Sequence, residues 1–99
     1  MLYIIWEFQV RNGKRKQFET YYSGKGKWAT LFRKGRGYQG TFLFRDVDSP
    51  NRYFLADVWK NLQSFRNFQR RFAAQYEALD KKCEEFTVEE NCLGYFENS

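Results

Sequence analysis

The segment RYFLADVWKN, residues 52–61, decides how this chain folds. Its aromatic and β-branched residues predict a strand over residues 52–59, and Asn61 is a residue type favoured at a helix N-cap. Apolar residues then recur at alternating spacings of three and four, which predicts one long amphipathic helix. These residues are Phe65, Phe68, Phe72, Tyr76, Leu79 and Cys83. Upstream, residues 47–51 (VDSPN) form a turn that joins this strand to an alternating strand over residues 38–46.

The rest of the chain is predicted to form a first strand, two short helices and a final strand. Residues 2–10 predict a first strand, and residues 14–22 and 27–34 predict two short helices. Residues 86–96 predict the fourth strand. The order is βαββαβ with one extra short helix, which predicts an α+β, ferredoxin-like antiparallel sheet. We expect a single domain over residues 1–99.

Two amphipathic helices must cover one face of such a sheet, which leaves the other face without a cover. We expect Tyr3, Ile5, Leu43 and Leu55 to lie on that second face, where they would be apolar enough to need a partner. A second copy of the chain would cover it, because a two-fold dimer reuses one self-complementary surface. The sequence therefore predicts a homodimer.

Charge raises the question of nucleic acid, because the formal net charge is +5. Basic residues concentrate in residues 11–36 and glutamates in residues 84–99. Arg36, Gly37 and Tyr38 resemble the opening of the RNA-recognition-motif signature, and that fold has the same element order. The signature belongs on the third strand, however, whereas the match falls on the second. RNA binding stays as the least favoured function, and nucleic acid is not the expected partner.

Several other classes of protein are disfavoured. The segment GRGYQG at residues 35–40 matches a dinucleotide-binding pattern, but it lies between a helix and a strand instead of between a strand and a helix. The chain has no His, and Cys83 and Cys92 are its only cysteines, so we expect no metal site. No apolar run approaches the ~20 residues of a membrane span, and no secretion signal is recognisable. We expect a cytoplasmic protein that does not contact a membrane.

A motif around the third strand resembles the antibiotic biosynthesis monooxygenase family. That family's pattern is Y-x-x-x-D-x-W-x-S-x-x-x-Y-x-x-F, and Asn61 and Phe65 replace its Ser and second Tyr. The positions that follow it here are Tyr53, Asp57, Trp59, Asn61, Phe65 and Phe68. Further similar segments are residues 5–8, 28–33, 37–41 and 93–96. The resemblance therefore spans nearly the whole chain.

The resemblance implies a dimeric α/β barrel with a pocket between sheet and helices in each subunit. Active members of the family include cofactor-free monooxygenases of polycyclic aromatic phenols, and haem degraders. The haem degraders need an Asn on the first strand, a Trp near the end of the third and an iron-ligating His. Trp59 matches the Trp, but Trp6 falls near the Asn position and no His exists. Haem degradation is therefore disfavoured, and we expect no cofactor.

Cofactor-free oxidation requires an apolar pocket, a base and a group that stabilises the substrate anion. Asp57 would be the base if burial raised its pKa, and Trp59 is the second candidate catalytic residue. Arg33 or Arg45 would stabilise the anion. The candidates for the pocket walls are Trp6, Trp28, Trp59, Phe68, Phe72 and Tyr76. The structural alternatives are that these aromatics fill the core and that Asp57 pairs with an Arg or a helix N-terminus.

Three functions follow from the sequence. The first is a cofactor-independent monooxygenase that acts on a small aromatic or quinone-type molecule. The second is a non-catalytic dimeric small-molecule-binding or structural protein of the same fold. The third is the RNA-binding module considered above. The sequence leaves open whether the chain is an enzyme.

Overall fold

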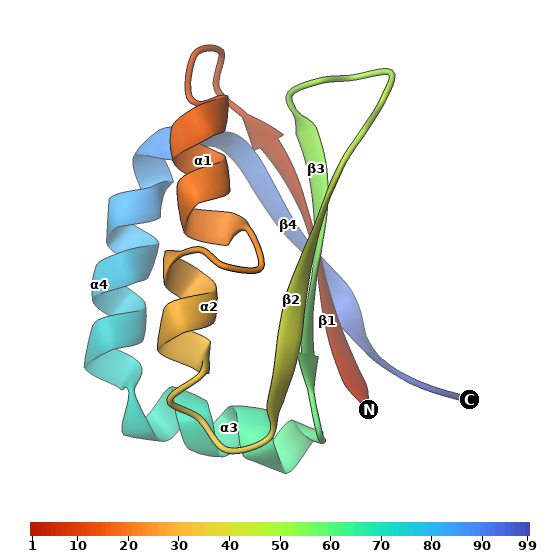
Figure 1. Ribbon diagram of the computed structural model, residues 1–99, viewed down its shortest axis with the longest axis vertical. Helices are drawn as coiled ribbons and strands as arrows, with labels where there is room; N and C mark the ends of the chain where they lie inside the picture. Colours follow the sequence, from red (N-terminus) through yellow and green to blue (C-terminus); the bar gives the residue numbers. More distant parts are fainter.

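A computed structural model describes all residues, 1–99, and places four helices against one face of a four-stranded sheet (Figure 1). The elements are β1 (Leu2–Val10), α1 (Arg15–Tyr22), α2 (Lys27–Phe32), β2 (Tyr38–Arg45), β3 (Arg52–Trp59), α3 (Leu62–Arg71), α4 (Ala73–Cys83), the 3₁₀ helix η1 (Glu84–Phe86) and β4 (Thr87–Glu97). The predicted boundaries of the first three strands and of α1 agree with these to within one residue. The predicted α+β, ferredoxin-like fold is confirmed.

The sheet is antiparallel throughout, with strand order β2-β3-β1-β4. In the β1–β3 register, Trp6 lies opposite Leu55 and Ile4 lies opposite Asp57. Directly opposed residues in an antiparallel pair share one face. The carboxyl group of Asp57 is therefore on the same face as the apolar residues that the helices cover.

The hydrophobic core lies between this face and the helices, and it consists mainly of rings. Phe18 from α1 and Trp59 from β3 are fully buried. The Trp59 ring packs against Phe68 of α3 and Phe32 of α2, with centroids 5.2 and 5.8 Å apart. Large rings bury much area per side chain, so this small chain needs few residues to fill its core.

The single long helix predicted after Asn61 is wrong, because the structure breaks it at Phe72. That residue has φ −115° and ψ 30°, and α3 lies across the end of the sheet while α4 runs along it (Figure 1). Asn61 caps α3 as predicted, with its side chain accepting a 2.8 Å hydrogen bond from the Ser64 amide. Backbone hydrogen bonds from Phe72 to Phe68 and from Tyr76 to Phe72 continue across the break. The three- and four-residue spacing of apolar residues therefore continues through the kink, so the spacing alone does not reveal the break.

The prediction for the outer face of the sheet is partly wrong. Leu43 pairs with Leu55, which pairs with Trp6, so both leucines face the helices. The register shift between Tyr38 and Gly40 is a bulge that changes which residues of β2 point inward. Tyr3 and Ile5 lie on the outer face as predicted, together with Phe42, Phe44, Phe54 and Phe96. That face is still apolar, since Phe42 and Phe44 are 53% and 59% exposed.

None of the helices combines the length and the apolar character needed to cross a membrane.

Candidate functional site

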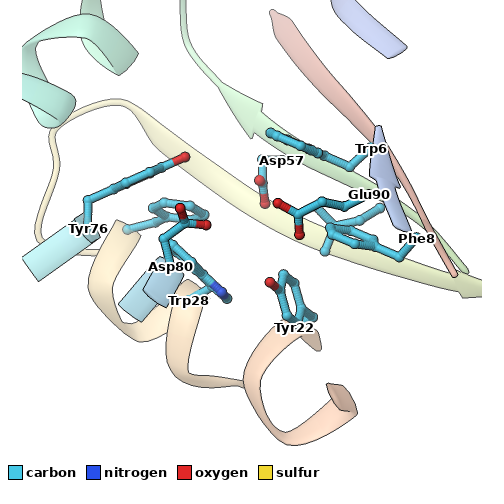
Figure 2. A pocket seen from close by; sticks show the side chains of 10 residues that line it. Trp6, Phe8, Tyr22, Trp28, Asp57, Tyr76, Asp80 and Glu90 are labelled. Atoms are coloured by element: carbon cyan, nitrogen blue, oxygen red, sulfur yellow. The ribbon is translucent and has the colours of Figure 1, made fainter. Parts of the chain in front are cut away.

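A pocket opens between the inner face of the sheet and helices α1, α2 and α4 (Figure 2). Its empty space measures about 410 Å³, a value that includes the open mouth. Six aromatic rings and one leucine form most of the wall. The lining residues are Trp6, Phe8, Tyr22, Trp28, Phe32, Leu55, Asp57, Tyr76, Asp80 and Glu90.

Asp57 is the buried acid at the base of this pocket, and its side chain is only 7% exposed. Thr41 Oγ1 donates a 2.7 Å hydrogen bond to its Oδ1. Because Thr41 has a single hydroxyl proton, the Tyr38 hydroxyl at 2.5 Å donates to Thr41 in turn. The three side chains form a chain of hydrogen bonds that ends at the carboxyl group, so its orientation is fixed.

Burial changes the protonation of Asp57. Loss of hydration raises the pKa of its carboxyl group to about 7, although the Thr41 hydrogen bond acts in the opposite direction. No ion pair compensates the charge, since all three ion pairs of the molecule lie elsewhere. A group with a pKa near the working pH can both accept and return a proton. Asp57 therefore has the acid–base property that a proton-transfer site requires.

Two more carboxyl groups face the same space, Asp80 from α4 and Glu90 from β4 (Figure 2). The pKa of Asp80 is raised by burial and then by the nearby charge of Glu84. The pKa of Glu90 is raised by burial and then by Asp80 and Glu84. No Lys, Arg or His lines the pocket. The field in the pocket is therefore negative, although the chain as a whole is basic.

The aromatic wall contains one unpaired donor. Trp28 is 6% exposed, and its indole Nε1 is buried with no hydrogen-bond acceptor. Its ring packs edge-on against Tyr76, with centroids 5.0 Å apart, and 6.1 Å from the ring of Tyr22. Burial raises the pKa of both tyrosines above the ordinary range. Both hydroxyl groups therefore stay protonated at neutral pH.

Four of the residues predicted for the site come together in this pocket: Asp57, Trp6, Trp28 and Tyr76. Trp59 and Phe68 do not line it, because both are buried in the core behind it. Trp59 packs behind the pocket wall, with its ring centroid 5.8 Å from that of Phe32, which lines the pocket, and 5.3 Å from that of Tyr38. A catalytic role for Asp57 or Trp59 stays a prediction.

The remaining three predicted residues lie outside the pocket. Phe72 lines a separate basic depression beside Lys34, Arg36 and Arg71. Arg33 is exposed and donates a 3.0 Å hydrogen bond to the carbonyl of Gly24. Arg45 is also exposed and lies in a shallow hollow with Glu19 and Tyr53. Neither guanidinium group belongs to the wall of the aromatic pocket.

Sequence reasoning missed Tyr38, Thr41, Asp80 and Glu90 as members of the site. Thr41 and Glu90 reach it through strand pairing, because Thr41 lies opposite Asp57 and Glu90 lies opposite Phe8. Those pairings depend on a bulge in β2 and on register shifts in β4, which periodicity does not reveal. Asp80 reaches the site because α4 changes direction at Phe72. The only signal in the sequence for Asp80 was its place next to Leu79, which belongs to the apolar stripe of the helix.

Metal coordination does not fit this arrangement of acids. No group of three or more His, Cys, Asp or Glu side chains lies close enough together to hold a metal ion. Cys83 is buried and Cys92 is exposed, and the two do not form a disulfide.

Solved structures of the same shape include several oxygenase-type proteins. A Bordetella bronchiseptica protein described as an antibiotic biosynthesis monooxygenase is 21% identical, covering 99% of this chain and 96% of its own, with a TM-score of 0.74. SnoaB, a cofactor-independent oxygenase from Streptomyces nogalater, is 24% identical, with coverages of 99% and 92% and a TM-score of 0.71. A Deinococcus radiodurans protein described like the first has a TM-score of 0.78 at 11% identity, covering 100% and 93%. At these identities the likeness establishes the fold.

Sequence comparison adds the family. No curated protein sequence matches the chain. The family model for antibiotic biosynthesis monooxygenase matches residues 1–76, which include β1 to β3, Asp57 and most of the aromatic wall. Since that match covers three quarters of the sequence, and the fold agrees over its full length, this chain belongs to the antibiotic biosynthesis monooxygenase family.

Proposed function

We propose that this protein is a cofactor-independent monooxygenase that oxidises a small aromatic phenol or quinol in the pocket, with Asp57 as the base. The observation that supports the proposal most directly is Asp57 itself. It is a buried carboxyl group with a pKa near neutrality, fixed by Thr41 and facing a pocket of aromatic rings. Family membership and the likeness in fold to SnoaB, a cofactor-independent oxygenase, agree with this chemistry.

The reaction begins with proton transfer to Asp57 from an activated C–H bond of the substrate, a methylene group between two aromatic rings. The resulting carbanion is electron-rich and reacts with O₂ to form a C–O bond and a peroxide. Asp57 returns the first proton to the peroxide and takes a second proton from the remaining C–H bond as the O–O bond breaks, which gives a carbonyl product. Asp57 returns its proton to the departing oxygen, which leaves as water. In total, one methylene group and one O₂ become one carbonyl group and one water.

The other residues of the site hold this geometry. Tyr38 and Thr41 orient the carboxyl group of Asp57 by the chain of hydrogen bonds described above. Trp59 packs against Tyr38, so its proposed part is to position the start of that chain without contact with the substrate. The aromatic rings exclude water, which strengthens the electrostatic interactions of the reacting anion.

An oxygen electrode with anthrone as the substrate tests the proposal. We expect catalysed oxygen uptake, and we expect Asp57→Asn to lower its rate by about 10²-fold or more, which is the usual contribution of a positioned base. Asp48→Asn is the matched control, because Asp48 is an exposed residue of the β2–β3 turn and does not line the pocket. Equal rates in Asp57→Asn and the wild type would exclude Asp57 as the base.

One observation favours the second function, a binding protein without catalysis. A substrate anion needs positive charge for stabilisation, and no Lys, Arg or His lines the pocket. If this function is correct, native mass spectrometry of the purified protein detects a retained ligand, and neither anthrone nor a quinol stimulates oxygen uptake. Catalysed uptake that depends on Asp57 would exclude it.

The proposal includes a homodimer that covers the outer face of the sheet. Phe42, Phe44 and Phe96 are each about half exposed there, and an apolar surface of this kind in a monomer is a typical interaction site. We expect native mass spectrometry to show a mass of twice 12.1 kDa.

Charge placed on this face tests the dimer. The double variant Phe42→Lys/Phe44→Lys should be monomeric, because lysine ammonium groups would be buried between two copies. Val47→Lys is the control, since Val47 is 88% exposed in the neighbouring turn and should leave the dimer intact. A double variant that stays dimeric would place the interface elsewhere.

A further inference from the structure

The aromatic pocket combines features that a neutral hydrocarbon ligand does not explain. Six of its lining residues are aromatic, three are acidic and none is basic. The chain carries a formal net charge of +5, so the acidic character of the pocket is opposite to that of the whole molecule. The residues concerned lie on separate elements, β3, α4 and β4, and Figure 2 shows their carboxyl groups directed toward the same central space.

These acids form no ion pair in the protein. The three ion pairs of the molecule use Glu7, Asp46 and Glu85, and none of these residues lines the pocket. Asp57, which is more than nine-tenths buried, has one oxygen bound to Thr41, and its other oxygen receives no hydrogen bond from the protein. That oxygen is not among the fully buried atoms without a partner, so it is accessible from the pocket that Asp57 lines. This unpaired oxygen faces the pocket, so a molecule bound there would meet it.

The form of the site indicates an organic cation in preference to a metal ion. The acids are not close enough together to coordinate a metal. An ammonium group interacts well both with carboxylates and with the faces of aromatic rings, and cages of such rings are a known means of binding it. The rings of Trp28, Tyr76 and Tyr22 line the same pocket as the acids and provide such faces.

We infer that the pocket selects aromatic molecules that carry a protonated amine, with the ammonium group bound by Asp80 and Glu90, the ring enclosed by the aromatic wall, and Asp57 left free to act as the base. The inference deepens the proposed function, on which it rests, by naming the class of molecule that the same site accepts. Binding is measured without oxidation, so the two can fail separately.

Three commercially available phenols whose para side chains differ in charge provide the test. Tyramine is cationic, 4-ethylphenol is neutral and 3-(4-hydroxyphenyl)propionate is anionic at pH 7.5. Isothermal titration calorimetry of the full chain should show tyramine binding at least about tenfold more tightly than 4-ethylphenol, with no binding of the anion. Equal affinity for tyramine and 4-ethylphenol, or tighter binding of the anion, would overturn the inference.

Two variants locate the preference within the pocket. Glu90→Gln and Asp80→Asn should each weaken tyramine binding about fivefold and leave 4-ethylphenol unchanged, because each removes one negative charge at the mouth. Both side chains belong to exposed residues, so the fold should tolerate the changes. Glu89→Gln is the matched control, since Glu89 is the preceding residue of β4 and points to the opposite face. Equal effects of Glu89→Gln and Glu90→Gln would show a general charge effect and overturn the inference.

Oxygen uptake separates the two proposals. If tyramine binds as expected while anthrone and a quinol cause no uptake, the ligand class stands and the oxidation fails. If anthrone is oxidised while tyramine binds no better than 4-ethylphenol, the oxidation stands and the inference fails.

Discussion

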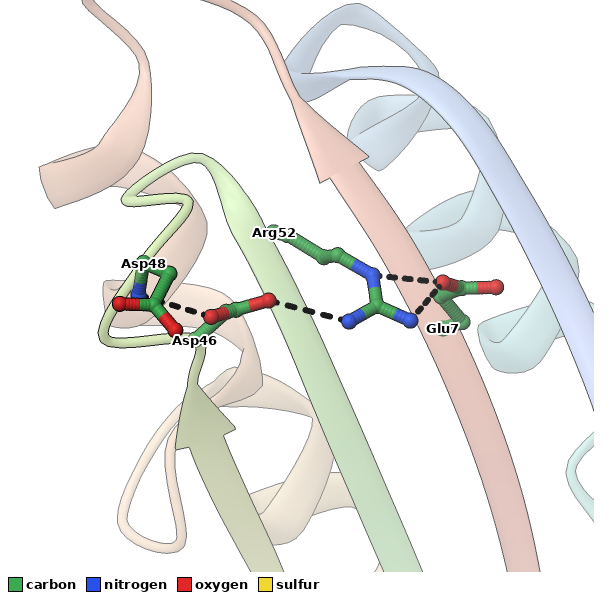
Figure 3. A network of polar contacts seen from close by, with 4 residues as sticks. All are labelled: Glu7, Asp46, Asp48 and Arg52. Carbon is green, nitrogen blue, oxygen red and sulfur yellow. Dashed lines mark hydrogen bonds and ion pairs between the residues drawn. The ribbon is translucent and has the colours of Figure 1, made fainter.

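Strand β3 carries two charged residues that meet opposite environments. Arg52 lies on the outer face, where it pairs with Glu7 at 2.6 Å and with Asp46 at 3.0 Å (Figure 3). Asp57, five residues along, lies on the inner face with no cationic partner. An odd separation on a strand places two side chains on opposite faces. The same short strand thus carries both a compensated and an uncompensated charge.

The pKa values of Asp46, the partner of Arg52, and of Asp57 are shifted in opposite directions. The pKa of Asp46 is lowered, first by the hydrogen bond from the Asp48 amide and then by that from Arg52. The pKa of Asp57 is raised to about 7, because burial is the dominant cause. An acid that forms an ion pair at the solvent-exposed surface, as Asp46 does, stays ionised and has a structural role. Burial without pairing gives an acid whose proton is available for chemistry.

The largest expected effect is that Asp57→Asn changes how the free energy of unfolding depends on pH. Below pH 4 Asp57 is neutral in both the folded and the unfolded chain, and between pH 4 and 7 only the unfolded chain ionises. The wild type should therefore lose roughly 2–4 kcal/mol of stability from this group as pH rises through that range. Asp57→Asn should abolish the loss and be more stable than the wild type at pH 8.

Urea unfolding at pH 4, 6 and 8 measures this difference. The two proteins should be similar in stability at pH 4 and diverge above it. Asp48→Asn, the exposed control, should follow the wild type at every pH. A difference between Asp57→Asn and the wild type that does not change with pH would contradict the raised pKa.

A smaller effect is expected when the support of Asp57 is removed. Thr41→Val deletes the hydrogen bond that lowers the pKa of Asp57 and leaves the Tyr38 hydroxyl without its acceptor. We expect a loss of about 1–2 kcal/mol in the free energy of unfolding. The pH profile of oxygen uptake should also move to higher pH, because the base is then harder to ionise. An unmoved profile would show that Thr41 does not set the pKa.

Thr20→Val is the control for that variant. Thr20 is exposed on α1 and its hydroxyl only donates to the Lys16 carbonyl, so neither stability nor the pH profile should change appreciably.

The smallest effect is expected on the outer face. Arg52→Gln removes the ion pairs with Glu7 and Asp46, but exposed pairs contribute little to stability and are screened by salt. Thermal unfolding should show a slight decrease in midpoint at low ionic strength that disappears in 1 M NaCl. A large decrease that survives in high salt would mean that Arg52 acts through packing against the Phe54 ring, 4.8 Å away, instead of through charge.

The sequence predicted the elements better than their junctions. Alternation and helical spacing located all four strands and the first two helices, because those periods follow directly from backbone geometry. The break at Phe72 was missed, since neither Pro nor Gly marks it and the hydrogen bonds continue across it. The bulge between Tyr38 and Gly40 was missed because nothing in the alternation of residues along β2 marks it.

The site was predicted in part, and the reason is visible in Asp57 and Arg45. Asp57 belongs to a motif in one continuous strand, so its place at the end of β3 followed from local sequence. Arg45 was expected in the pocket, yet β2 ends in an exposed position that places it beside Glu19 instead. A cationic wall and an acidic wall are equally compatible with the element order, since only the packing of strands and helices decides which side chains meet.

What the sequence determined by itself is the βαββαβ order, the apolar faces and the family motif around Asp57 and Trp59. These depend on periodicity and on residues adjacent in the chain. Only the tertiary structure decided that Trp59 belongs to the core, that Asp57 forms no ion pair, and that Asp80 and Glu90 line the same pocket as Asp57. Those facts depend on strand register and on the direction of α4, which are set by how the whole core packs. Contacts between distant segments therefore determine the chemistry of this pocket.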